Sequence, residues 1–366
     1  MTSCAARTSE TPDQRVRRLV ALHFHPETGS RYWVRRAARL GLSPQRDLQS
    51  EADLLRLGPM DASALADRAV EEFVPAGVLA GGRAGLVPVE TGGTSGRPKF
   101  AVHRRDEFLQ AFVAPFVAAA ARCGFPREVN WLFLGPTGPH VIGQAARACA
   151  EAMGSMGPFC VDFDPRWARA LVEGSFSRTR YLQHIEEQAS RVLAAQEIGV
   201  LFATPPVLAS LGAKVDPPCR QRIRGIHFGG MCVTSQLRAE LAELFPNAVM
   251  LSGYGNTLFG MMPELAYDPR HGIDYFPHGA RLLVRLVEMG EGGEGDRLGR
   301  PVATGRRGQV VVTRLDEAQL IVNMFERDSA VRLPPPADAG PGFVRDGLRD
   351  VQPIVTERTK PPGGLY

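Results

Sequence analysis

The stretch VETGGTSGRPKF, residues 89–100, places three glycines and three hydroxyl side chains directly before a proline and a lysine. Glycine lets a loop adopt positive φ angles and approach a ligand closely. Thr91, Thr94 and Ser95 can donate hydrogen bonds, and Lys99 adds a point charge that suits a phosphate. The stretch therefore predicts a phosphate-binding loop, although these residues leave open which phosphate it binds.

Several well-known loops are excluded at this position. A Walker A loop needs Gly-Lys-Ser/Thr at the start of a helix, whereas here Lys99 follows Pro98 and precedes Phe100. This stretch contains no G-x-G-x-x-G, and Arg97 stands where the hydrolase motif G-x-S-x-G needs its last glycine. A single loop of this composition is more often an ordinary surface turn, so its meaning depends on the rest of the chain.

Composition limits the function further. The 366 residues include 43 Lys and Arg against 39 Asp and Glu, a net charge of +4, and the basic residues are scattered. Scattered charge does not favour a nucleic-acid partner. Six widely spaced cysteines without a C-x-x-C pair are typical of reduced thiols rather than disulfides or a zinc site. The N-terminus lacks an apolar run, and no segment is long enough to span a bilayer, so we expect a cytoplasmic protein without a membrane partner.

The pattern of apolar residues changes twice along the chain. Up to residue 83 it has helical spacing, most clearly over 16–22, 32–42 and 50–70. From 84 to 280, short apolar runs alternate with amphipathic stretches. After residue 280 the pattern becomes rich in strands, and a Pro/Gly-rich tail begins at Leu333, which we expect to be ordered only by docking.

The middle part predicts a largely parallel sheet. Buried runs that alternate with helices are typical of βαβ units, and ligands of such sheets gather beyond the carboxyl ends of the strands. The predicted strands are 130–136, 199–205, 225–230 and 248–255, and the predicted helices are 144–153, 181–195 and 235–244.

Four motifs then follow one another in the order of a known family. Residues 91–99 resemble the phosphate loop of the adenylate-forming superfamily, which contains acyl-CoA synthetases, aryl-CoA ligases and peptide-synthetase adenylation domains. Phe228-Gly-Gly-Met231 resembles its adenine-binding segment, and Ser252-Gly-Tyr-Gly-Asn-Thr257 resembles its Tyr-Gly-x-Thr motif. Residues 308–313 and Glu326-Arg-Asp328 resemble its late strand and ribose-binding aspartate. The resemblance covers roughly residues 85–350.

Residues 135–140 and the length pattern are most similar to the phenylacetate-CoA ligase-like branch, in particular to its short phenazine-biosynthesis acyl-adenylate synthetases that lack the C-terminal lid domain. The resemblance implies an α/β fold, a large adenylation core over residues 1–350. Its parts are a helical region 1–83, parallel α/β subdomains 84–280 and a smaller β-rich subdomain 281–350. Residues 351–366 would then be a tail near the hinge where the missing lid would start.

The same resemblance implies a function. It predicts ATP-dependent activation of a carboxylic acid, preferably aromatic, as an acyl-adenylate with release of pyrophosphate, in secondary metabolism. ATP/AMP and Mg²⁺ would be the cofactors. We expect a separate acyl acceptor or lid-like protein as a partner, and a homodimer.

Site residues follow from the matched motifs. We expect Thr257 and Lys99 to act on the phosphates and His140 to line the carboxylate pocket, although a histidine at the start of a helix is also often structural. His227 is a further candidate for the border of the substrate pocket. The expected nucleotide-binding residues are Thr91, Gly92, Gly93, Thr94, Ser95, Gly96, Gly229, Gly230, Gly253, Tyr254, Gly255, Asn256, Thr257 and Asp328.

One departure from the family keeps alternatives open. The Tyr-Gly-x-Thr motif is normally followed by a glutamate that helps to hold Mg²⁺, but this chain has Leu258, which offers no oxygen ligand. Glu264 could supply the carboxylate, phosphates and water could hold the metal, or the ATP chemistry could be weakened. Two other functions also remain open. One is adenylation of nitrite or another small oxyacid for transfer to an amine, and the other is a non-catalytic nucleotide-binding relative.

Overall fold

The computed structural model describes residues 10–92, 97–137 and 140–354. Its N-terminal part is helical, as expected, but the predicted helix over 50–70 is wrong as one continuous element. Gly58 has a φ of 64° and is followed by Pro59, so a helix cannot pass through this point. The elements are α1 (Pro12–His23), α2 (Arg31–Arg39), α3 (Pro44–Asp47), η1 (Asp53–Leu57), α4 (Ala64–Asp67), η2 (Val70–Glu72) and α5 (Ala76–Ala80).

A short antiparallel hairpin follows, made of β1 (Leu86–Glu90) and β2 (Phe100–Arg104). The remaining strands form one sheet with the order β10-β11-β12-β13-β9-β8-β7-β6-β5-β3-β4. They are β3 (Asn130–Gly135), β4 (Phe159–Asp162), β5 (Ile198–Ala203), β6 (Gly225–Gly229), β7 (Val249–Asn256), β8 (Gly260–Asp268), β9 (Gly272–Tyr275), β10 (Leu282–Val287), β11 (Arg307–Leu315), β12 (Leu320–Leu333) and β13 (Gly347–Pro353).

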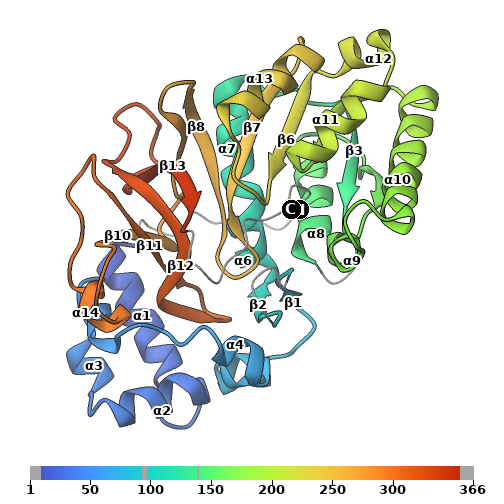
Figure 1. The fold of residues 1–366 in the computed structure, drawn as a ribbon. Helices are drawn as coiled ribbons and strands as arrows, with labels where there is room; N and C mark the ends of the chain where they lie inside the picture. Colours follow the sequence, from blue (N-terminus) through green and yellow to red (C-terminus); the bar gives the residue numbers. More distant parts are fainter. Residues whose placement is uncertain (1–9, 93–96, 138–139, 355–366) are drawn as a thin grey trace.

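The sheet changes character at β7. Strands β3, β5, β6 and β7 are parallel, as predicted, and β4, which was not predicted, joins them in parallel at the edge. β8 then pairs antiparallel to β7 and leads into the antiparallel part. In Figure 1 the two parts stand side by side, with β7 and β8 between them.

Helices cover both faces of the parallel part. One face packs Leu201 and Ile226 against α10, α11 and α13, and the other packs Phe133 and Phe202 against α7 and α8. The helices after β2 are α6 (Arg105–Phe108), the π-turn η3 (Leu109–Val113), α7 (Ala114–Cys123), α8 (Val141–Ala152), α9 (Pro165–Ala170), α10 (Phe176–Ala195), α11 (Pro205–Lys214), α12 (Pro217–Arg222), α13 (Ser235–Leu244) and α14 (Glu294–Leu298).

The N-terminal helices pack on the antiparallel part, below β10–β12 in Figure 1. The indole of Trp33 on α2 is fully buried and donates to the Leu320 carbonyl at 3.0 Å, and Arg15 on α1 donates to the Leu315 carbonyl. These bonds fix the turn between β11 and β12, which lies close to the site described below.

The segment after Leu333, which we expect to be ordered only by docking, contains a strand that the sequence did not predict. Residues 347–353 form β13, which pairs with β12 on one side and β9 on the other. Its neighbours supply the pairing, and the Arg349–Asp274 ion pair at 2.6 Å adds to it. Residues 355–366 lie outside the described residues.

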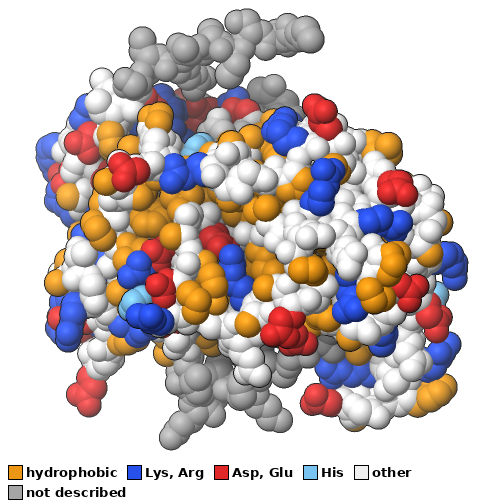
Figure 2. Space-filling model, turned by 90° about the horizontal axis from the view of Figure 1, so that it is seen from above, with side chains coloured by type: hydrophobic (Ala, Val, Ile, Leu, Met, Phe, Trp, Pro, Cys, Tyr) orange, Lys and Arg blue, Asp and Glu red, His pale blue; other side chains and the backbone are white. Residues whose placement is uncertain are grey.

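The face of the molecule seen in Figure 2 shows no large field of one charge. Basic and acidic side chains are interspersed over the face seen in Figure 2. Within the described ranges, none of the helices combines the length and the apolar composition needed to cross a membrane.

Candidate active site

A cavity of about 520 Å³ opens where the carboxyl ends of β3, β5, β6 and β7 meet the β1–β2 hairpin and β12. Its size is typical of a small-molecule site. The predicted residues that line it are Thr91, Gly92, Lys99, His140, Gly229, Gly230, Gly253, Tyr254, Gly255, Asn256, Thr257 and Asp328. Residues Gly93, Thr94, Ser95 and Gly96 lie outside the described residues.

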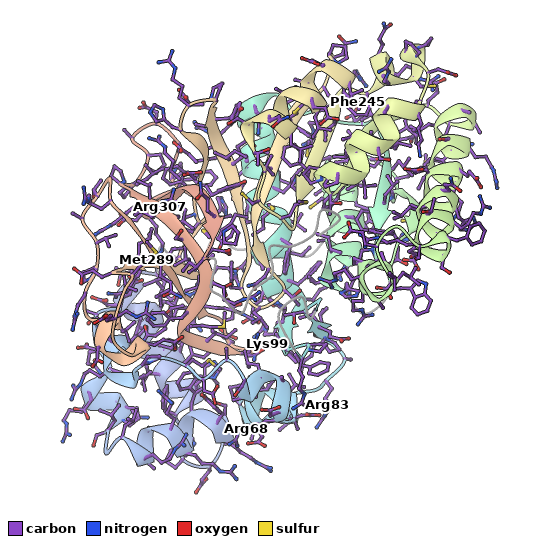
Figure 3. The ribbon with its side chains drawn as sticks, viewed as in Figure 1. Arg68, Arg83, Lys99, Phe245, Met289 and Arg307 are labelled. Carbon is purple, nitrogen blue, oxygen red and sulfur yellow. The ribbon has the colours of Figure 1, made fainter. Side chains whose placement is uncertain are left out.

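The hairpin holds the two ends of the phosphate-loop sequence together. The Thr91 N–H donates to the Lys99 carbonyl, and the Lys99 N–H donates to the Thr91 hydroxyl, both at 2.9 Å. Lys99 lies between the hairpin and β12 (Figure 3). The loop therefore starts and ends at the cavity.

Thr257 is anchored through its backbone. Its carbonyl accepts from the buried ring of His103 at 3.1 Å, while its hydroxyl lies 3.5 Å from the Glu90 carbonyl. The next two carbonyls are also held, because Arg314 donates to Leu258 at 2.9 Å and Arg281 donates to Phe259 at 2.6 Å. The Thr257 hydroxyl is thus presented by a rigid segment, with only a long hydrogen bond of its own.

Two glycines allow the strands around the site to approach closely. A Cβ on Gly229 would lie 2.7 Å from the Gly253 carbonyl oxygen, and a Cβ on Gly255 would lie 1.9 Å from the Gly260 oxygen. Any side chain at these positions would force β6, β7 and β8 apart. Strand packing alone explains these two glycines, whatever the ligand.

Tyr254 and Asp328 are brought together across the sheet. The tyrosine hydroxyl on β7 donates to Asp328 Oδ2 on β12 at 2.9 Å. Burial raises the pKa of Asp328, while the tyrosine hydroxyl and Arg327 oppose that rise. Burial, followed by the Asp328 charge, raises the pKa of Tyr254 well above its usual value, so the phenol remains a donor.

Glu326 is a cavity residue whose role the sequence comparison did not identify. It lies two residues before Asp328 on β12, so both side chains point to the same face of the strand. Asn256 Nδ2 lies 3.3 Å from each of its oxygens. Burial, followed by the Asp328 charge, raises the pKa of Glu326 to about 7, although Asn256 and Lys99 oppose the rise. The i, i+2 spacing to Asp328 was the signal that could have identified it.

Two polar groups at the strand ends have buried atoms without a partner among the described residues, His140 Nε2 and Thr204 Oγ1. His140 precedes α8 and Thr204 precedes α11, and both line the cavity, yet neither side chain caps its helix. Burial, followed by the positive charge of Arg166, lowers the pKa of His140. An unpaired buried polar group is costly unless a ligand satisfies it. Thr204 was not predicted, although it directly follows a strand end.

The inner wall of the cavity is apolar and largely aromatic. It contains Phe133 on β3, Phe202 on β5 and Phe112 on η3, together with Val141 and Cys149 on α8. The Phe133 and Phe202 rings are 5.3 Å apart between centroids. One cavity thus joins a polar region at the strand ends to an apolar region under α8.

Glu264, the expected metal ligand, is not among the residues that line the cavity. Its two oxygens accept from Arg238 at 2.7 and 2.8 Å, and one of them also accepts from the Ser252 N–H at 2.9 Å. This ion pair, rather than a metal, satisfies the carboxylate. Within the described ranges, no group of three His, Cys, Asp or Glu side chains is arranged to hold a metal ion.

Comparison with known proteins shows which fold this chain shares with solved structures. No family model matches the chain, and no curated protein matches it by sequence. Among solved structures it is similar to 2-hydroxyisobutyryl-CoA ligase in the postadenylation state with R3-HIB-AMP, with a TM-score of 0.66 and 13% identity, covering 93% of this chain and 66% of that one.

Two further structures of that ligase give the same result. The thioesterification state with 2-HIB-AMP and CoA has a TM-score of 0.66 and 14% identity, covering 96% of this chain and 69% of the other. An open conformation has a TM-score of 0.62 and 14% identity, covering 95% and 74%. The chain spans about two thirds of the length of the ligase chains first named here. It has the α/β fold of their adenylation core.

Proposed function

We propose that this protein activates a carboxylic acid with ATP, forming an acyl-adenylate and pyrophosphate. One observation supports this most. The phosphate-loop ends, the Tyr-Gly-Asn-Thr segment and the Asp328 strand are separated by up to 237 positions (328 − 91), yet they line one cavity with an apolar wall. A nucleotide and an apolar acid can therefore lie end to end in it.

The residues can be assigned roles in that reaction. The carboxylate oxygen attacks the α-phosphorus in line, a new P–O bond forms, and the bond to pyrophosphate breaks. Lys99 and the Thr257 hydroxyl would lie against the phosphates, where fixed charge and donors stabilise the developing negative charge. His140 Nε2 and Thr204 Oγ1 would satisfy their missing hydrogen bonds on the acid or the phosphate. Asp328 would accept from the ribose hydroxyls, and Tyr254 would lie beside the adenine.

Mg²⁺ would enter with ATP as part of the substrate. Leu258 is 3% exposed and belongs to the apolar core, so it cannot hold the ion. Among the described residues, the carboxylates that line the cavity are Glu326 and Asp328. Mg²⁺ bound to ATP commonly needs only one or two carboxylates besides phosphates and water. We infer that Glu326 is the carboxylate that takes this place, and that the ion would neutralise phosphate charge there.

The substrate we propose is an aromatic acid of secondary metabolism, as in the phenylacetate-CoA ligase-like branch. The ring-lined wall of Phe112, Phe133 and Phe202 supports an aromatic guest, because stacked and edge-to-face rings attract one another. The metabolic setting rests on the sequence resemblance alone.

Acid-dependent exchange of labelled pyrophosphate into ATP tests the proposal. The panel should contain aromatic acids, short aliphatic acids and nitrite. Lys99→Ala should be compared with Lys214→Ala, which changes the last residue of α11, where the lysine pairs with Glu186 on α10. Exchange with an aromatic acid that Lys99→Ala reduces at least tenfold, while Lys214→Ala does not, supports acyl-adenylate formation. Exchange with nitrite alone favours the oxyacid function. AMP binding without any exchange favours a nucleotide-binding protein and contradicts the proposal.

A further inference from the structure

One histidine lies within the aromatic wall of the cavity. The register of the parallel strands aligns Phe133, Phe202, His227 and Leu251 as neighbours on β3, β5, β6 and β7. Residues aligned in this way point to the same face of a sheet. Phe133, Phe202 and Leu251 belong to the core on the side of α7 and α8. His227 is thus the polar member of an otherwise apolar row, and it lines the cavity.

The hydrogen bonding of His227 determines which ring nitrogen can bind a ligand. Nδ1 lies 2.7 Å from the Leu251 carbonyl oxygen, which can only accept, so Nδ1 carries the proton. Burial lowers the pKa of His227 to about 4, and the ring is therefore neutral at neutral pH. Nε2 then has a free lone pair and is an acceptor only.

The ring is held in one orientation. Its centroid lies 4.4 Å from that of Phe202 and 4.8 Å from that of Phe116, and the side chain is 4% exposed. Among the described residues, the bond made by Nδ1 is the one hydrogen bond found for the His227 side chain. Nε2 is not among the fully buried atoms that lack a partner, and the residue lines the cavity, so solvent can reach this nitrogen. A ligand that displaces this solvent must supply a donor, because the acceptor would otherwise be left unpaired.

His227 also lies deeper than the other unpaired groups. It precedes Gly229, at the strand end, by two positions, which is roughly 7 Å along a strand. His140 and Thr204 lie beyond the ends of β3 and β5, nearer to the polar region. A ligand group that reaches His227 must therefore belong to the part of the acid that enters the apolar wall, away from its carboxylate.

We propose that the substrate is an aromatic acid bearing a hydroxyl or amino donor on its ring, and that His227 Nε2 accepts from this donor. The inference rests on the proposed function and specifies its substrate class. A site built to bond a donor discriminates strongly against an analogue that lacks it, because the acceptor is then left buried and unpaired. His227 would thus determine specificity without acting on the reacting atoms.

The test pairs acids that differ only in the donor. Hydroxy- and aminobenzoates with the substituent at each ring position are compared with their methyl and methoxy counterparts. Acid binding is measured by calorimetry without ATP, and adenylation by pyrophosphate exchange. For the best ring position, the wild type should prefer the donor-bearing acid by about 10- to 100-fold. His227→Phe should abolish this preference while still binding the methyl acid.

Two further variants make the result specific. His227→Gln keeps an acceptor and should retain part of the preference. Cys149→Ala removes only a weak bond from the thiol to the Phe112 carbonyl, leaves His227 and its bond to Leu251 in place, and should retain all of the preference. The inference is overturned if the wild type binds and adenylates the paired acids equally well, or if His227→Phe keeps the same preference. It is also overturned if none of the aromatic acids binds. Calorimetry that shows the preference without any exchange leaves the inference standing and contradicts the adenylation function.

Discussion

Two groups of carboxylates lie near the segment 256–259, and they differ in how their charge is balanced. Asp316, in the turn between β11 and β12, is 1% exposed and contacts Arg281 at 2.5 Å and Arg314 at 2.6 Å. Glu326, ten residues later (326 − 316), has the amide of Asn256 as its partner. Among the described residues, no ion pair with an arginine or lysine involves Glu326 or Asp328.

The pKa values of the two groups reflect this difference. Burial alone would raise the pKa of Asp316, but Arg281 and Arg314 together hold it well below its usual range. The pKa of Glu326 is raised to about 7 because burial and Asp328 outweigh its partners. The charge of Asp316 is balanced by Arg281 and Arg314, and these arginines also hold the carbonyls of Leu258 and Phe259. Glu326 and Asp328 line the cavity, where a ligand would have to balance their charge.

The largest expected effect is on the balanced group. Asp316→Asn leaves two buried guanidinium groups without their carboxylate and should reduce the free energy of unfolding by about 3–5 kcal/mol. Urea denaturation followed by circular dichroism measures it. Asp346→Asn breaks the half-buried Arg332–Asp346 pair and serves as the control, with an expected loss below about 1 kcal/mol. Equal losses in both variants would contradict the special role of Asp316.

The next effect concerns the nucleotide. If Asp328 accepts from the ribose hydroxyls, Asp328→Ala should weaken AMP binding by about 1.5–3 kcal/mol, the range for a hydrogen bond to a charged group. Calorimetric titration with AMP measures this change. Asp268→Ala, at an exposed carboxylate outside the cavity, is the control and should leave the affinity unchanged. An unchanged affinity in folded Asp328→Ala would remove Asp328 from the nucleotide site.

A stability measurement tests the unbalanced group. Glu326 has a higher pKa in the folded chain, about 7, than the ordinary 4.5. The folded state therefore binds more protons between these values, and stability is lost as pH rises through 7. Glu326→Gln avoids this loss and should be more stable than the wild type by about 1–3 kcal/mol at pH 8, with little difference near pH 4.5.

Urea midpoints at the two pH values measure the Glu326→Gln effect. A gain of the same size at both values would show that packing rather than charge is responsible. Addition of MgATP at pH 8 should reduce the difference between the two proteins, since the ligand then balances the wild-type carboxylate.

The comparison also shows what the sequence could reveal. Strands β3, β5, β6 and β7 and helix α13 were predicted because a buried parallel strand is one continuous apolar run and an amphipathic helix has its own period. Strand β13 was missed because its pairing comes from β12 and β9 rather than from its own residues. Motif order identified Thr257 and Asp328 as candidates, and both line the cavity.

Charge balance could not be predicted, because it depends on partners that are distant in sequence. Glu264 and Glu326 are both glutamates within strands, and the sequence does not show which of them an arginine neutralises. The fold places Arg238 against Glu264 and leaves Glu326 with Asn256. Glu264, the expected metal ligand, thus forms an ion pair with Arg238, while Glu326, which was not predicted, lines the cavity.

The smallest expected effect concerns the Tyr254 hydroxyl, which donates to Asp328. Tyr254→Phe removes the 2.9 Å hydrogen bond to Asp328 but keeps the ring beside the proposed adenine position. Because that bond favours the charged carboxylate, its loss should raise the pKa of Asp328 further. Where Asp328 is ionised in both proteins, AMP binding should weaken by only about 0.5–1 kcal/mol. As the pH falls, the variant should lose affinity before the wild type does, because its carboxyl is protonated first. AMP titrations of both proteins over a series of pH values measure this difference. A loss at the alkaline end of the series larger than that of Asp328→Ala would mean that the tyrosine hydroxyl, rather than the carboxylate, holds the nucleotide.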